Sequence, residues 1–246
     1  MNTGRLYVVG IGPGDSAQMT PRAAWALTQS EVIAGYSLYL DLIAPLLEGK
    51  EIIRTAMRGE RERCEAAVQA ALSGRVVAVV SGGDAGVYGM AGLVLELAEP
   101  HPGLEVEVIP GVTAATAAAA VLGAPLGHDF AVISLSDLLT PWEIIEKRLQ
   151  LCAAGDMVIC LYNPSSKSRE GYLARACAAI LQHRDGGTPC GIVRQAGRIG
   201  QTHRILPLEE LVNTPADMLT TVIVGSSRTR TVNGRLITPR GYKLHG

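Results

Sequence analysis

The stretch from Val76 to Met90, VVAVVSGGDAGVYGM, sets the strongest limits on the fold of this chain. Its first five residues are an unbroken run of valine and alanine, which is typical of a parallel strand covered by helices on both faces. The run ends in Ser81-Gly82-Gly83-Asp84, and a helical pattern follows from Gly86. This order places the glycine turn at the carboxyl edge of a sheet, where open α/β folds bind ligands. We therefore expect a small-molecule site here; the alternative is a tight turn with Asp84 as the helix cap.

Strand and helix patterns alternate through the first half of the chain, which predicts a parallel or mostly parallel sheet with helices on both faces. After the segment Gly123–His128, helices mix with hairpin-like returns, which favours a mixed sheet. We therefore expect two α/β domains, residues 1–123 and residues 124–246. His128 stands alone at this joint, and a lone histidine in a linker is more often structural than catalytic.

Two helices have the same start signal, a threonine followed by proline. Thr20 and Pro21 are expected to cap and open one helix, and Thr140 and Pro141 another. Proline suits the first helical position because its missing N–H would have no partner there.

Composition bounds the classes of function. The chain is 48% hydrophobic and 18% charged, with a net charge of -1, one Phe and two Trp. This balance argues against a nucleic-acid surface, which needs basic side chains or stacking aromatics. No apolar run reaches about 18 residues and no signal peptide is expected, so we expect a soluble cytoplasmic protein without a membrane partner. The five cysteines form no C-x-x-C pair and do not cluster with histidines, so no metal site or disulfide framework is predicted.

One dinucleotide-binding pattern needs to be weighed. The segment Gly12–Ala17 formally fits G-x-G-x-x-A after the strand Leu6–Val9. However, Asp15 would put a carboxylate where the pyrophosphate should lie, and the next strand ends in Gly35-Tyr36 without an acid for the ribose. The context argues against a nicotinamide cofactor and against a non-catalytic Rossmann sensor module.

Several predicted strands end in polar or glycine-rich turns, and none of these turns has a P-loop lysine, a nucleophile elbow or a metal triad. Such a site suits chemistry whose reactivity is carried by a bound cofactor. The turns are Gly12–Asp15, Gly82–Asp84, Gly111–Thr113, Tyr162–Asn163 and Arg194–Gly197.

These same segments resemble a known family. VVGIGPGD at 8–15, SGGDAGVYGM at 81–90 and IPGVTAATAAAA at 109–120 are similar to the glycine-rich signatures of the tetrapyrrole (class III) methyltransferases, which use S-adenosylmethionine. ISLSDLLTPWEIIEKRL at 133–149, LYNPSSKSR at 161–169 and TPRGY at 238–242 resemble members that methylate C-17 of precorrin-3B in cobalamin synthesis and contract the macrocycle. The resemblance covers nearly the whole chain, from about Arg5 to Tyr242.

The resemblance implies two α/β domains, a homodimer, and S-adenosylmethionine folded into a cleft between the domains, with S-adenosylhomocysteine as its product. By similarity, residues of the first domain would hold the methionine part and sugar, and residues of the second would supply the adenosine side. The first set is Pro13, Gly83, Asp84, Val87, Tyr88, Thr113 and Ala114; the second is Tyr162, Asn163, Gln195, Ala196, Thr220 and Thr221.

Ring contraction needs proton transfer, so an acid or base should lie near the substrate. The candidates are Asp15, Ser136 and Asp137, each of which could instead be a loop or capping residue. Arginines are expected around a substrate rich in carboxylates; the alternative for those at 54 and 58 is a solvated charged face. The predicted substrate residues are Tyr36, Arg54, Arg58, Arg169 and Arg194. A sister enzyme acting at C-11 or C-20, and a cobalt-containing C-17 substrate, remain as alternatives.

Overall fold

The structure is a computed structural model that describes residues 4–166 and 170–243. The chain forms two compact units, Met1–Ala114 and Ala115–Gly246. The division falls at the start of a helix that the sequence analysis assigned to the first domain. A domain boundary at Gly123–Ala124 stays a prediction.

The first unit contains a fully parallel sheet of five strands in the order β3-β2-β4-β1-β5. Residues Val77 to Val80 of the central strand are at most 1% exposed, which confirms the expectation of a strand buried on both faces. The strands are β1 (Arg5–Gly10), β2 (Val32–Tyr36), β3 (Glu51–Thr55), β4 (Val76–Ser81) and β5 (Glu105–Ile109).

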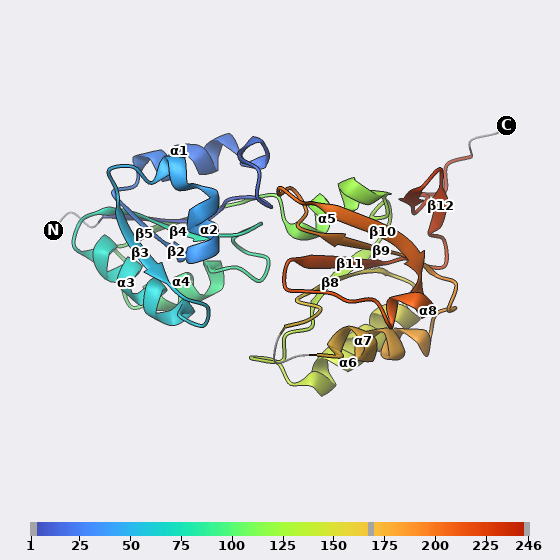
Figure 1. Cartoon of the computed structure of the whole chain (residues 1–246). Helices are drawn as coiled ribbons and strands as arrows, with labels where there is room; N and C mark the ends of the chain where they lie inside the picture. The colour runs from blue at the N-terminus through green and yellow to red at the C-terminus, as the bar shows by residue number, and fades with distance from the viewer. Residues whose placement is uncertain (1–3, 167–169, 244–246) are drawn as a thin grey trace. The chain divides into compact units, whose positions relative to one another are not determined.

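Helices cover both faces of this sheet (Figure 1). One core contains Ala23 and Leu27 of α1 with Leu40 of α2, and the other contains Val68 of α3 with Val94 of α4. Alternate residues of each strand enter the two cores, as a pleated strand requires. The helices are α1 (Pro21–Gln29), α2 (Ser37–Leu42), α3 (Glu60–Leu72) and α4 (Ala91–Ala98), with short 3₁₀ helices η1 (Ser16–Gln18) and η2 (Ala44–Leu46).

The strand order creates a switch point between β1 and β4. These two strands are neighbours, but β1 leads into α1 on one face and β4 leads into α4 on the other. Open α/β folds bind ligands at such switch points, outside the carboxyl ends of the strands. Both glycine turns next to this point were predicted as ligand loops from the sequence.

The second unit is built on a mixed sheet of five strands in the order β10-β9-β11-β8-β7, in which only β7 and β8 pair in parallel. The mixed sheet confirms the predicted fold class. The strands are β7 (Phe130–Ser134), β8 (Val158–Tyr162), β9 (Pro189–Arg194), β10 (Thr202–Pro207) and β11 (Thr220–Val224). A three-stranded sheet, in the order β12-β13-β6, consists of β6 (Gly123–Ala124), β12 (Arg230–Val232) and β13 (Arg235–Ile237).

Helices also cover both faces of the second sheet (Figure 1). Ile145, Leu173 and Leu211 pack from α6, α7 and α8 into one core, and Leu122 of α5 lies against Gly191 on the other face. A Cβ at Gly191 would lie 2.3 Å from the Leu122 side chain, so glycine is needed for this close packing. The helices are α5 (Ala114–Leu122), α6 (Trp142–Ala154), α7 (Tyr172–Leu181) and α8 (Leu208–Leu211).

One of the two predicted helix starts is wrong. Thr20 is the N-cap of α1 and its hydroxyl accepts the Ala23 N–H at 3.1 Å, as expected. In α6 the N-cap is Pro141, which makes no side-chain cap hydrogen bond, so Thr140 does not cap that helix. The helix begins at Trp142, which is buried and packs edge-on against Tyr172 of α7.

Candidate functional site

The turns after β1 and β4 are joined by main-chain hydrogen bonds at the switch point. Gly12 and Gly83 exchange two bonds, at 3.0 Å and 2.8 Å, and the Ile11 N–H donates to the Ser81 carbonyl at 3.0 Å. Gly12 and Gly83 have φ values of +77° and +73°, a region that glycine adopts without strain. The two turns therefore form one rigid main-chain platform.

The turn after β5 packs directly on this platform. A Cβ at Gly111 would lie 2.2 Å from the Gly83 carbonyl oxygen and 2.6 Å from that of Gly10. The built Cβ position of Gly83 is 3.6 Å from Ala114 N and from Thr113 Cα. Three glycines thus allow three turns to meet main chain to main chain, and the structure brings the predicted cofactor residues Gly83, Thr113 and Ala114 together.

The Asp84 carboxylate connects two of these turns. Its Oδ1 accepts the N–H groups of Gly86 and Val87 at 2.8 Å and 3.1 Å, and its Oδ2 accepts the Gly111 N–H at 2.9 Å. Both carboxylate oxygens are therefore engaged by the protein's own backbone. The assignment of Asp84 as a cofactor residue stays a prediction. What the structure shows is that its carboxylate holds the β4 and β5 turns together.

The segment after Asp84 differs from the predicted helix. We expected a helix from Gly86, but α4 begins at Ala91. The Asp84 side chain takes the first N–H groups, and Tyr88 has a left-handed φ of 54°, so regular helical bonding cannot start earlier. The resulting long turn carries the predicted cofactor residues Val87 and Tyr88, and Tyr88 is 58% exposed.

The turn after β1 carries Pro13, which is buried, and Asp15, which is exposed. Asp15 is the N-cap of η1, where its Oδ1 accepts the Ala17 N–H at 2.9 Å. The capping alternative is thus present in the structure. The capping bond uses only Oδ1 and leaves Oδ2 available for proton transfer. The catalytic assignment of Asp15 therefore stays a prediction.

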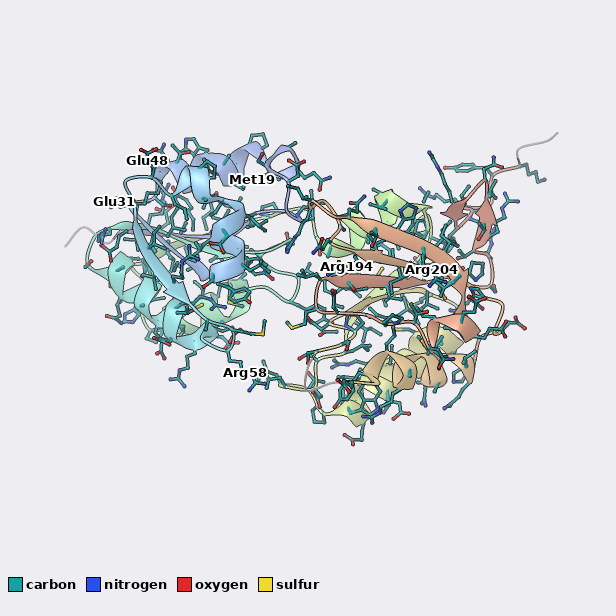
Figure 2. The ribbon with its side chains drawn as sticks, in the orientation of Figure 1. Met19, Glu31, Glu48, Arg58, Arg194 and Arg204 are labelled. Atoms are coloured by element: carbon teal, nitrogen blue, oxygen red, sulfur yellow. The ribbon has the colours of Figure 1, made fainter. Side chains whose placement is uncertain are left out.

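The predicted substrate residues of the first unit lie at the ends of β2 and β3. The Tyr36 ring meets Tyr39 edge-on at 5.5 Å, and Tyr39 in turn lies where a Cβ of Gly82 would be. Arg54 donates to Asp41 at 2.8 Å. The Arg58 guanidinium has no hydrogen-bond or ion-pair partner among the described residues, and its φ is 72° (Figure 2). Arg169 lies outside the described residues.

One arginine of this region, Arg63, is buried and was not predicted as a site residue. The Arg63 side chain is 5% exposed and donates to the Thr55 hydroxyl at 2.5 Å, with Glu60 at 3.6 Å. Its Nη2 lies 3.8 Å from the Met90 sulfur, and its Nε is buried without a partner. Arg63 therefore ties the end of β3 to the residue just before α4. In the sequence it is hidden within a run of alternating charges.

In the second unit, a polar network lies at the carboxyl ends of β7 and β8. The Asn163 amide donates to the Ser134 hydroxyl at 2.9 Å, which also accepts the Ser136 N–H at 3.2 Å. The Leu135 N–H donates to the Tyr162 carbonyl at 2.8 Å, and the Tyr162 hydroxyl accepts the Ala115 N–H at 2.6 Å. The structure thus brings together the predicted residues Tyr162, Asn163 and Ser136.

Asp137 follows in the same loop and is held by a helix. Its Oδ2 accepts the Tyr172 hydroxyl at 2.6 Å. Tyr172 and Trp142 pack edge-on at 5.0 Å, and the Arg175 guanidinium lies 4.1 Å from the centre of the Trp142 ring. This aromatic and cationic cluster fixes the loop that carries Ser136 and Asp137, whose catalytic assignments stay predictions.

The ends of β9 and β11 meet at the same edge, because β11 runs antiparallel to β9 and begins where β9 ends. Thr220 pairs with Arg194, Thr221 pairs with Val193, and the Gln195 N–H donates to the Leu219 carbonyl at 2.8 Å. Four predicted residues, Arg194, Gln195, Thr220 and Thr221, are therefore neighbours. Ala196 follows directly and is buried.

Asp217 organises this edge and was not predicted. Arg194 Nε donates to its Oδ2 at 2.6 Å, and its Oδ1 accepts the Thr220 hydroxyl at 2.7 Å and the Leu219 N–H at 2.9 Å. Burial opposes ionisation of Asp217, but these three hydrogen bonds outweigh burial and hold its pKa below the ordinary value. Asp217 is therefore a fixed anion that orients Arg194.

Backbone strain concentrates at predicted site residues. In the described part of the chain, six non-glycine residues have a positive φ, and four of them are Arg58, Tyr88, Asn163 and Gln195. A left-handed φ costs on the order of 1–3 kcal/mol and persists where the surroundings impose it, which happens often at functional sites. Two of the four lie in the first unit and two in the second, and their roles as site residues stay predictions.

Within residues 4–166 and 170–243, no three His, Cys, Asp or Glu side chains gather closely enough to hold a metal ion. No helix in these ranges has the length and apolar character needed to cross a membrane.

Comparison with known proteins identifies relatives along nearly the whole chain. The chain is 49% identical over 240 residues to a Salmonella typhimurium protein named probable cobalt-factor III C(17)-methyltransferase, covering 97% of this chain and 100% of that protein. It is 43% identical over 249 residues to a Sinorhizobium protein named precorrin-3B C(17)-methyltransferase, covering 98% of each. Some other relatives are longer, and the chain spans about half of their length.

Solved structures agree with this similarity. The crystal structure of the methyltransferase CobJ matches with a TM-score of 0.89 at 41% identity, covering 96% of this chain and 100% of that chain. A uroporphyrin-III C-methyltransferase from Thermus thermophilus, complexed with S-adenosylhomocysteine, has the same fold, with a TM-score of 0.71 at 24% identity and coverage of 90% and 97%. Residues 5–212 match the tetrapyrrole (corrin/porphyrin) methylase family. The chain therefore belongs to the tetrapyrrole methylases.

Proposed function

We propose that this protein transfers a methyl group from S-adenosylmethionine to C-17 of precorrin-3B or its cobalt-containing counterpart, with contraction of the macrocycle, in cobalamin biosynthesis. The observation that carries the proposal is similarity along the full length of relatives named for C(17) methyl transfer. The same names favour C-17 over C-11 or C-20 as the methylated carbon.

The glycine platform of the first unit suits S-adenosylmethionine. Glycines at positions 12, 83 and 111 let three turns meet main chain to main chain at the switch point, so a ligand there would meet mainly main chain. When bound, the cofactor supplies an electrophilic methyl group. The rigid platform would supply approach geometry, which is worth up to roughly 7–11 kcal/mol for well-oriented reactants.

Two sets of residues are proposed to hold this cofactor, each described within its own unit. The turns of the first unit would bind the methionine part and the sugar, and the strand ends of the second would bind the adenosine side. The sets are Pro13, Gly83, Asp84, Val87, Tyr88, Thr113 and Ala114, and Tyr162, Asn163, Gln195, Ala196, Thr220 and Thr221.

Ring contraction is proposed to use a proton carried by Asp15, Ser136 or Asp137. The two carboxylates can be tested without disturbing their structural bonds. Asp15→Asn keeps an oxygen for the Ala17 N–H, and Asp137→Asn keeps one for the Tyr172 hydroxyl. We expect Asp15→Asn to bind S-adenosylhomocysteine like the wild type but to yield no contracted product. Full yield of contracted product from this variant would remove Asp15 from the mechanism.

The arginines predicted to meet substrate carboxylates differ in their surroundings. Arg54 and Arg194 have carboxylate partners, whereas Arg58 has none among the described residues. We propose that Arg58 contacts substrate more directly than Arg54, and that Tyr36 lies beside them. An Arg58→Gln variant should raise KM for the tetrapyrrole more than Arg54→Gln does, and the reverse order would contradict this assignment.

The experiment that tests the function is methyl transfer with isotopically labelled S-adenosylmethionine. Purified protein is incubated with metal-free precorrin-3B and, separately, with its cobalt-containing counterpart, and the products are examined by mass spectrometry and carbon NMR. Label at C-17 in a contracted ring supports the proposal, and the substrate that reacts faster decides between the two metal states. Label at C-11 or C-20, or no transfer to either substrate, contradicts it.

Two expectations about the assembled protein accompany the proposal. We propose a homodimer, because the family resemblance implies one, and we propose that it acts in the cytoplasm. Light scattering after size-exclusion chromatography tests the dimer, and a monomeric mass at the assay concentration would overturn it.

A further inference from the structure

A pocket of about 430 Å³ lies on the second unit, beside the ends of β9, β10 and β11. Its volume falls within the range of small-molecule sites. The lining combines basic and hydroxyl side chains over an apolar floor; the residues that matter here are Ile192, Arg194, Thr202, Arg204, Asp217 and Thr220. The pocket belongs to the second unit alone and includes a proposed cofactor residue, Thr220, at its border.

The hairpin register places the two arginines on one face. Arg194 pairs with Thr202, and Arg204 pairs with Ile192, so Arg194 and Arg204 are diagonal neighbours on adjacent strands. Diagonal neighbours in an antiparallel pair lie about 7–8 Å apart, within reach of long side chains. Figure 2 shows both arginines along these strands. Two guanidinium groups can therefore meet the same ligand.

Both arginines have donors to spare. Asp217 engages only the Nε of Arg194, and in residues 4–166 and 170–243 the terminal nitrogens of Arg194 have no hydrogen-bond partner. Arg204 lies 4.0 Å from Glu210, too far for a hydrogen bond, and its side chain is 63% exposed. Asp217 thus orients Arg194 from behind and leaves the two-pronged end of its guanidinium open, the geometry that binds a carboxylate with two bonds.

We propose that this pocket binds a carboxylate-bearing side chain of the tetrapyrrole, held by Arg194 and Arg204 and by the hydroxyl of Thr202. This inference rests on the proposed function, because it assigns the recognition of one substrate side chain to residues beside the proposed cofactor site. The macrocycle is the occupant because the pocket adjoins the strand ends that carry the proposed cofactor residues Gln195 and Thr220.

The test is a fluorescence titration of the full-length protein with uroporphyrin, a stable tetrapyrrole polycarboxylate, in the presence of S-adenosylhomocysteine. Arg204→Gln should raise Kd about tenfold, equivalent to about 1.4 kcal/mol, and Arg194→Gln should do the same. Arg230→Gln is the matched control, because Arg230 is an exposed arginine of β12 outside the pocket lining. Binding should also weaken with added salt, since the proposed pairs are partly exposed.

A second arm separates the macrocycle from free small acids. Tricarballylate, a small tricarboxylate, should compete with uroporphyrin only weakly; if it binds as tightly, the pocket is a site for free carboxylic acids and the proposal is overturned. Wild-type affinity in both glutamine variants would also overturn it. If the wild type methylates its substrate and Arg204→Gln leaves the substrate KM unchanged, this pocket does not bind the substrate, but the proposed function stands. Absence of methyl transfer by the wild type would instead defeat the proposed function.

Discussion

Removal of the Asp84 carboxylate should loosen the two glycine turns that it joins. In Asp84→Ala, the N–H groups of Gly86, Val87 and Gly111 lose their acceptor. Gly86 is exposed and can turn to water, whereas the other two bonds are partly buried. A hydrogen bond to a charged group contributes about 1.5–3 kcal/mol, so two losses at the lower value cost about 3 kcal/mol. For a chain of this size, that lowers Tm by about 6–12 °C.

Asp84→Asn gives an intermediate test of the same reasoning. Its amide oxygen can still accept from Gly86 and Val87, but its NH₂ group would face the Gly111 N–H, donor against donor. One lost bond corresponds to about 1.5 kcal/mol, or about 3–6 °C.

The assay for both variants is thermal unfolding followed by circular dichroism, with Asp41→Ala as the control. Asp41 forms an exposed pair with Arg54, so its loss should cost at most about 1 kcal/mol. The expected order of Tm is wild type, then Asp84→Asn, then Asp84→Ala. An Asp84→Ala variant as stable as Asp41→Ala would refute the view that this carboxylate holds the turns together.

Three further outcomes are expected. The Ser227 hydroxyl and N–H and the Arg184 guanidinium bind Asp156 and outweigh the effect of its burial, so its pKa lies below the ordinary value. This stabilisation is complete above the unfolded pKa of about 3.9 and fades as pH falls toward the folded pKa. In urea titrations, Asp156→Asn should therefore be less stable than the wild type at pH 7. The difference in the free energy of unfolding should shrink below about pH 4. In Tyr88→Gly, glycine adopts the left-handed φ without strain, so Tm should not fall. The variant loses the ring proposed to contact the cofactor, so calorimetry should show weaker binding of S-adenosylhomocysteine. Wild-type affinity would show that the ring is not part of the site. Burial raises the pKa of all five cysteines, and only Cys152 is partly exposed, so iodoacetamide should modify Cys152 alone in the native state, as mass spectrometry can check.

The fold class could be predicted because it depends on local pattern. The Val76–Val80 run and the alternation of strands and helices identified the parallel sheet, since burial on both faces leaves a continuous apolar strand. The strand order, and with it the switch point between β1 and β4, could not be predicted, because it depends on which strands pair across long stretches of chain. The start of α4 was misplaced because the Asp84 side chain accepts the N–H groups of Gly86 and Val87 and Tyr88 takes a left-handed φ, neither of which the apolar pattern reveals.

The turns that carry the predicted site residues could be located from the sequence, but the contacts between them could not. Strand ends with glycine or polar residues identified the turns, and the structure brings Gly83, Thr113 and Ala114 together as neighbours in the first unit. Asp217 escaped notice because its partner Arg194 lies 23 residues away and only the β9–β11 pairing brings the two together. Arg204 could have been found by placing β9 and β10 in hairpin register, which sets it diagonally from Arg194.

The most direct test of the central claim is a calorimetric titration of the purified protein with S-adenosylhomocysteine, with NADH as the control. The claim is that the glycine turns at Gly12, Gly83 and Gly111 serve a methyl-transfer cofactor and not a dinucleotide. We predict one saturable site per chain for S-adenosylhomocysteine and no heat of binding for NADH. Binding of NADH without binding of S-adenosylhomocysteine would contradict the claim and return Gly12–Ala17 to a dinucleotide site.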